Sequence, residues 1–128
     1  MSLFNTFDPN SEAILEPSHI IRPVEGFPET IIMTFEEKSF QILREICKTE
    51  IAAMLRAGQD IPVYKLDWNG RSLGIFQVLI GGSGAAGLLE EALALGAKKV
   101  LVYGSCGVLD SALVAGHFIL PTAAYRDE

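Results

Sequence analysis

The apolar positions of this chain form short runs between turn-forming residues, which is typical of mixed strands and helices. The run 30–35 is rich in β-branched residues and does not alternate with polar ones, so it predicts a strand buried on both faces. Glu36 and Glu37 then favour a helix N-terminus, and apolar residues recur at spacings of three and four until Gly58. The pattern predicts one long amphipathic helix. Its apolar positions are Phe40, Leu43, Cys47, Ile51 and Met54.

A hairpin and a second helix are expected next. Residues 61–68 and 71–80 flank an Asn-Gly dipeptide at 69–70, which supplies the two positive-φ residues of a type I′ turn. We therefore expect an antiparallel pair of strands. Beyond them, Ser83 is a candidate N-cap for a helix with a Leu- and Ala-rich face, and Gly96 is its expected C-terminal stop.

Two further strands complete the expected sheet. Residues 100–103 predict a buried strand that ends at Gly104, and residues 117–123 predict a last strand near the chain end. This order of elements predicts an α/β fold with a mixed central sheet and flanking helices, and with ligand loops at the carboxyl ends of the strands. Because no helix follows the last strand, we expect an open edge, a bare apolar face and a truncated domain.

The first part of the chain differs from the rest. Residues 1–29 contain prolines that interrupt any regular element, which predicts an extended N-terminal arm ahead of the α/β part at 30–128. These prolines are Pro9, Pro17, Pro23 and Pro28.

Composition narrows the classes of function. The chain has 128 residues, 49% of them hydrophobic, and a formal net charge of −6, which suits one domain with a real core. An acidic chain argues against a nucleic-acid or membrane-surface partner, and no apolar run is long enough to span a bilayer. The N-terminus lacks the features of a signal peptide, so a cytoplasmic location is expected. Cys47 and Cys106 have no partners at ligand spacing, so we expect two free thiols and no metal site.

A glycine-rich segment at 82–87 matches the dinucleotide-binding pattern G-x-G-x-x-G, between a predicted strand and a predicted helix. That mechanism also needs an acidic residue about 20 positions later to bind a ribose hydroxyl. The chain has Val, Tyr and Gly there, at 102–104. A small dinucleotide-binding domain therefore remains an alternative to a simple strand-to-helix turn built from small residues.

A second loop, Gly-Ser-Cys-Gly at 104–107, follows a predicted buried strand. Glycines on both sides let backbone amides approach an anion, and the Ser105 hydroxyl adds a donor. The structural alternative is a tight turn that buries Cys106 in the core.

Several motifs together resemble a known family: ALALGAKK at 92–99, GSCG at 104–107, PTAA at 121–124 and RDE at 126–128. In this combination the chain resembles the purine nucleoside phosphorylase and uridine phosphorylase family. The resemblance implies an α/β fold around a mixed sheet, cleavage of the N-glycosidic bond of nucleosides, pentosyl transfer to phosphate, and assembly into oligomers. The implied partners are a nucleoside or ribose phosphate and further copies of the chain. Phosphate is the co-substrate, and no cofactor is expected.

The resemblance also implies roles for particular residues. It places Ser105 on phosphate and ribose, with Gly104, Cys106 and Gly107 matching the family's loop. A Pro-Ser-His-Ile segment at 17–20 is similar to the family's early His segment, which presents its His to the ribose site of a neighbouring subunit. His19 would have that role here, and a solvated surface His is the alternative.

The chain departs from the family pattern at both phosphate arginines. Residues 34–39 read TFEEKS where the family has Gly-Asp-Pro followed by Arg, and Val102 stands where the second Arg is expected. The acid that assists departure of the base also has no counterpart, so we expect the isolated chain to be inactive or very weak. A nucleoside hydrolase relative and a non-enzymatic, self-associating module are therefore further alternatives.

Overall fold

The computed structural model describes residues 10–124, which fold around one mixed sheet with the strand order β2-β3-β4-β1-β5. β1 is parallel to both β4 and β5, whereas β2, β3 and β4 form an antiparallel meander. The elements are α1 (Pro17–Ile20), β1 (Thr30–Thr34), α2 (Glu37–Ile46), β2 (Thr49–Leu55), β3 (Ile61–Trp68), β4 (Arg71–Gln77), α3 (Gly82–Leu95) and β5 (Lys99–Tyr103). The expected α/β fold, a mixed sheet with flanking helices, is confirmed.

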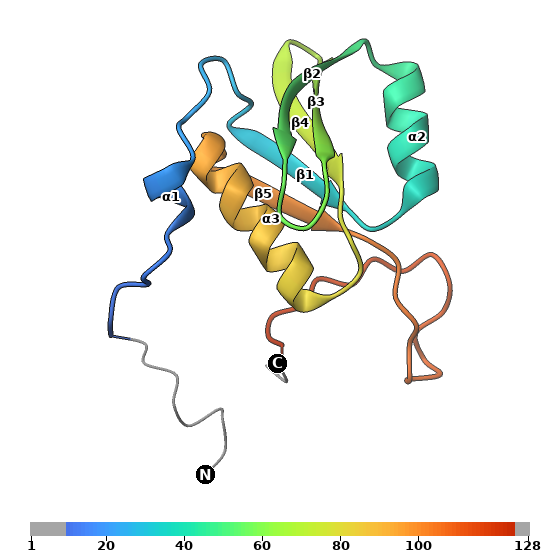
Figure 1. Cartoon of the computed structure of the whole chain (residues 1–128). Coiled ribbons are helices and arrows are strands. Elements are labelled where there is room, and N and C mark those ends of the chain that lie inside the picture. Colours follow the sequence, from blue (N-terminus) through green and yellow to red (C-terminus); the bar gives the residue numbers. More distant parts are fainter. Residues whose placement is uncertain (1–9, 125–128) are drawn as a thin grey trace.

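The two longer helices cover opposite faces of the sheet (Figure 1). Ile31 and Met33 of β1 point to the α3 face, where Leu88 packs on them in the main core. On the other face, Phe40 of α2 packs with Ile32 and its neighbours in a smaller core. The alternation along β1 therefore gives both faces apolar side chains, as the continuous apolar run predicted.

The predicted hairpin and second helix are confirmed. β3 pairs with β4 across a turn in which Asn69 and Gly70 have φ values of 52° and 74°, as a type I′ turn requires. α3 ends at Gly96, which has a φ of 129° and donates its amide to the carbonyl of Ala92. Its start differs from the prediction, because the N-cap residue is Gly81, which has no side chain, rather than Ser83.

The predicted long helix is wrong in its second half. α2 ends at Ile46, and residues 49–55 form β2, which pairs with β3 in antiparallel register. Ile51 lies opposite Tyr64, and the Glu50 carboxylate pairs with Lys65 at 3.6 Å. Spacings of three and four also occurred by chance in this stretch, and pairing with the free edge of β3 overrides the helical preference.

Two expectations about the last strands are also wrong. Residues 117–123 form no strand and lie outside the five-stranded sheet, which leaves the outer side of β5 unpaired within the described chain. β5 forms where it was predicted but is not buried, since Leu101 and Val102 are more than half exposed. Among residues 10–124, β5 pairs only with β1, and α2 covers the central strands rather than β5.

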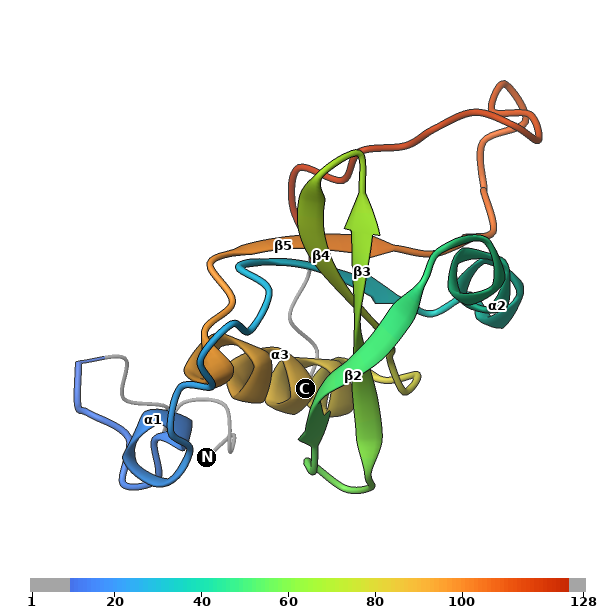
Figure 2. The ribbon, with the colours of Figure 1, turned by 90° about the horizontal axis from the view of Figure 1, so that it is seen from above.

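Part of the N-terminal arm packs on the body. Phe27 and Pro28 are buried, and the Val24 amide donates to the carbonyl of Leu95 at 3.0 Å. Figure 2 shows α1 beside α3, at the end of the molecule from which β1 and β5 start. The boundary proposed at residue 29 stays a prediction. Within residues 10–124, every helix is too short or too polar to cross a membrane.

Candidate functional site

Three parallel strands end at one edge of the sheet. β1 lies between β4 and β5, so the ends at Gln77, Thr34 and Tyr103 are neighbours (Figure 1). The chain leaves β1 towards α2 on one face and leaves β4 towards α3 on the other. Open α/β sheets bind ligands outside the carboxyl ends of strands at such a switch point. This edge is therefore the candidate site.

The loop 104–107 begins directly at this edge, and all four of its residues are exposed. The Phe35 amide donates to the carbonyl of Tyr103 at 3.1 Å, which ties the loop after β1 to the end of β5. A Cβ on Gly104 would lie 3.5 Å from side-chain atoms of Phe35, an ordinary contact distance. The two loops are thus in contact, and the Ser105 hydroxyl is accessible to a ligand.

Both cysteines are free, as predicted. Cys106 is exposed in the loop and Cys47 is half-buried at the end of α2. The alternative in which the loop serves to bury Cys106 in the core is therefore wrong.

In the loop after β1, side chains accept hydrogen bonds from nearby backbone amides. The Glu36 carboxylate accepts the Lys38 amide at 3.0 Å and the Ser39 amide at 2.6 Å, and so caps the start of α2. The Glu36 amide donates to the buried Thr34 hydroxyl oxygen at 3.1 Å. Hydrogen bonds hold the pKa of the Glu36 carboxyl below its ordinary value. Those from Ser39 have the largest effect on this pKa, and the one from the Lys38 amide adds a smaller one. Glu36 is therefore a stable anion at the helix N-terminus.

Beside this edge lies an open cavity of about 400 Å³ between α2, the start of β3 and the end of β4. The Arg44 guanidinium lies over the Tyr64 ring at 4.0 Å from its centroid and 5.6 Å from that of Phe40. The rings hold the cation beside the carboxyl end of β4, where Gln77 also lines the cavity. Sequence reasoning missed Arg44, although its spacing of four residues from Phe40 on a helix was a usable signal.

The structure separates His19 from the loop 104–107. His19 is exposed on α1, which packs on the second half of α3 at the opposite edge of the sheet. Its ring lies 3.7 Å from the Glu12 carboxylate. Within one chain, His19 therefore does not join the candidate site, which leaves only the neighbouring-subunit role that the resemblance implied.

The glycine-rich segment 82–87 forms the first turns of α3, after the N-cap Gly81 with φ of 126°. The first turn carries no acidic residue. A Cβ on Gly87 would lie 3.4 Å from that of Ala57, an ordinary contact distance, so the space around it does not demand a glycine. The position of the segment at the start of α3, after β4, agrees with the alternative of a strand-to-helix turn built from small residues.

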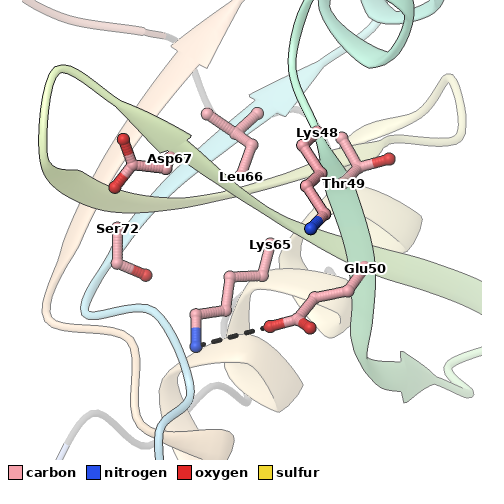
Figure 3. A pocket seen from close by; sticks show the side chains of 7 residues that line it. All are labelled: Lys48, Thr49, Glu50, Lys65, Leu66, Asp67 and Ser72. Atoms are coloured by element: carbon pink, nitrogen blue, oxygen red, sulfur yellow. Dashed lines mark ion pairs between the residues drawn. The ribbon is translucent and has the colours of Figure 1, made fainter.

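A second cavity, of about 280 Å³, lies away from this edge on the antiparallel strands (Figure 3). Lys48, Glu50, Lys65 and Asp67 line it, and the Lys65 ammonium reaches towards the Glu50 carboxylate. Asp67 accepts the Gly70 amide at 3.0 Å and so serves the hairpin turn. These charges balance one another on a solvated sheet face. Among residues 10–124, no cluster of His, Cys, Asp and Glu is suited to hold a metal ion.

Comparison with known proteins bears on the fold. No family model matches the sequence, and neither does any curated protein. Among solved structures, uridine phosphorylase from Vibrio fischeri ES114 is similar with a TM-score of 0.61 and 19% identity, over 81% of this chain and 43% of that chain. Purine nucleoside phosphorylase from Toxoplasma gondii, in complex with immucillin-H, has a TM-score of 0.56 and 17% identity, over 76% of this chain and 39% of that chain. The chain thus spans less than half the length of either protein and shares its fold with part of these nucleoside phosphorylases.

Proposed function

We propose that this chain binds nucleosides or ribose phosphates at residues 104–107 and takes part in chemistry at the N-glycosidic bond. The observation that carries the proposal is the exposed Gly-Ser-Cys-Gly loop at the carboxyl end of β5, on a fold similar to nucleoside phosphorylases. The Ser105 hydroxyl would bind a ribose hydroxyl or a phosphate oxygen. Gly104 and Gly107 leave the backbone amides on either side of it accessible.

A hydrolytic relative, with water as the nucleophile, is the second candidate function. It is favoured by Val102, an apolar residue that is 57% exposed where the resemblance expects a phosphate arginine. Without a guanidinium fork, a phosphate dianion loses its strongest contacts. We therefore expect little or no phosphate-dependent release of base from inosine, uridine or adenosine. Robust phosphorolysis by this chain would contradict that expectation.

The binding proposal is tested by titrating the chain with adenosine, uridine, ribose 1-phosphate and NAD while amide chemical shifts are recorded. Shifts centred on residues 104–107 are expected with a nucleoside or ribose phosphate. Shifts centred on 82–87 with NAD would favour the dinucleotide alternative instead, and no binding to the first three ligands would refute the proposal.

Ser105→Ala should weaken that binding about tenfold, which corresponds to one lost hydrogen bond of about 1 kcal/mol or slightly more. Because Ser105 is exposed, the melting temperature of the Ser105→Ala variant should equal that of the unchanged chain. Ser111→Ala, at another exposed serine outside the helices and strands, is the matched control. Equal binding by both variants would remove Ser105 from the site.

We also propose that the chain self-associates. β5 has a strand neighbour on one side within the described chain, and its apolar side chains are exposed. Such an edge invites pairing with a second copy. Sedimentation velocity at micromolar concentration should give a dimer or larger species, and a stable, folded monomer would contradict self-association.

A further inference from the structure

The start of α2 is a place where an anion would be expected to bind. It follows β1 at the candidate edge after two residues, Phe35 and Glu36, and Phe35 contacts the loop 104–107 at Gly104. Helix N-termini attract anions because their first amides lack partners in the helix and the helix dipole is positive there. A phosphorylated sugar at residues 104–107 would therefore gain from unoccupied amides at this helix start.

Two of those amides already have a partner within the chain itself. The two oxygens of Glu36 accept the amides of Lys38 and Ser39, one each. The Glu36 amide donates to the Thr34 hydroxyl oxygen. An incoming phosphate would have to displace a carboxylate that is held at 3.0 and 2.6 Å and tethered to the same backbone.

The two carboxylates at this helix start outnumber the one cation of its first turn, Lys38, and so also disfavour an anion. Glu37 follows Glu36 directly, and its carboxylate accepts the side-chain amide of Gln41 at 2.9 Å rather than pairing with a cation. The exposed side chains beside the loop, Phe35, Val102 and Tyr103, are aromatic or apolar. This surface suits an uncharged sugar and a flat base better than a dianion.

We infer that Glu36 is a specificity-determining residue, which makes this edge select an uncharged nucleoside over ribose phosphate or inorganic phosphate. The inference rests on the proposed function, since it concerns which ligand the loop 104–107 accepts. Glu36 acts as a built-in anion at the helix N-terminus, and it needs no contact with the nucleoside to do so.

The test compares binding of adenosine, ribose 1-phosphate and inorganic phosphate at constant ionic strength. Glu36→Gln removes the charge. Glu36→Ser also removes it but keeps an N-cap acceptor for one amide, so that α2 still forms and the other amide becomes accessible. Glu37→Gln is the matched control, because it changes the net charge equally one residue away. Circular dichroism verifies that each variant is folded.

The unchanged chain should bind adenosine at least about tenfold more tightly than ribose 1-phosphate. Both Glu36 variants should shift this ratio towards ribose 1-phosphate by about five- to tenfold, with amide shifts at Lys38 and Ser39, while Glu37→Gln shifts it less than about twofold. An unchanged ratio in a folded Glu36 variant, or equal shifts for the two positions, would overturn the inference.

The two proposals fail in different ways. If the unchanged chain binds adenosine and ribose 1-phosphate equally well, the proposed function stands and the role of Glu36 is wrong. If no version binds adenosine but Glu36→Ser gains inorganic phosphate at the Lys38 and Ser39 amides, the proposed function fails and Glu36 still closes this helix start to anions.

Discussion

β4 and β5 are both rich in apolar residues, and both lie beside β1 and run parallel to it, yet their environments differ. In β4, Ile75 and Phe76 have no exposed surface, whereas Leu101 and Val102 of β5 are 58% and 57% exposed. β4 has a strand on each side and helices over both faces. The difference teaches that neighbouring elements, rather than residue type, decide burial in this sheet.

The contrast continues beyond β5. Residues 104–124 contain apolar side chains but form no helix or strand, and Leu109 and Phe118 are almost completely exposed. Patches of this kind mark surfaces that bind another molecule. The candidate site lies where the packed sheet meets the exposed segment 104–124, because the loop 104–107 is the first part of that segment.

The largest expected effect comes from truncating one phenylalanine in each region. Phe76→Ala should lower the free energy of unfolding by about 3–5 kcal/mol, because it leaves a cavity in the core. Phe118→Ala should change it by less than about 0.5 kcal/mol in the monomer. Urea denaturation followed by circular dichroism measures both. A large loss for Phe118→Ala would mean that residues 104–124 are packed against something in solution, which would abolish the contrast.

A smaller effect is expected from adding a methyl group to one glycine in each region. A Cβ on Gly74 would overlap Cδ1 of Ile31, which is fully buried, and would lie 3.3 Å from Cβ of Pro28. Gly74→Ala should therefore cost about 1–3 kcal/mol through overpacking.

Gly107→Ala is the control, since a Cβ there meets nothing within 4 Å and the backbone needs no positive φ. Its melting temperature should be unchanged. A destabilised Gly107→Ala beside a neutral Gly74→Ala would reverse the assignment of packed and exposed parts.

Local signals were sufficient for the elements that local chemistry determines. The Asn-Gly turn predicted the β3–β4 hairpin, and Gly96 predicted the end of α3. The sequence was misleading where a distant partner decides the outcome. Residues 49–55 became a strand by pairing with β3, whereas residues 117–123 did not pair with the open side of β5 and formed no strand.

In the candidate site, too, some features were predictable from the local sequence and others depend on distant residues. The position of the loop 104–107 at a strand end was predictable from its glycines and the preceding apolar run. The acidic residues after β1 were expected to favour a helix start, but the bidentate contact of Glu36 with two amides depends on the loop geometry. Arg44 in its cavity depends on β3 presenting Tyr64 to α2, which no local pattern encodes.

The smallest expected effect is a pH dependence of the stability that Glu36 contributes at the start of α2. Hydrogen bonds lower the pKa of Glu36 in the folded chain below its ordinary value of 4.5, so the folded state favours the carboxylate. This contribution to stability is complete above the unfolded pKa, near 4.5, and is lost as the pH falls through the lower folded pKa. The Glu29 carboxyl also has a lowered pKa because of its hydrogen bond with Lys98, so the wild-type curve alone does not isolate Glu36.

The difference between the unchanged chain and Glu36→Gln does isolate it. At neutral pH the variant should be the less stable of the two, and the gap should narrow as the pH is lowered from about 5 towards 3. The acid-induced amide shifts that occur in the unchanged chain and are absent from Glu36→Gln should centre on Lys38 and Ser39, because these two amides donate to the Glu36 carboxylate. A gap that is constant with pH would mean that the Glu36 charge does not stabilise the start of α2.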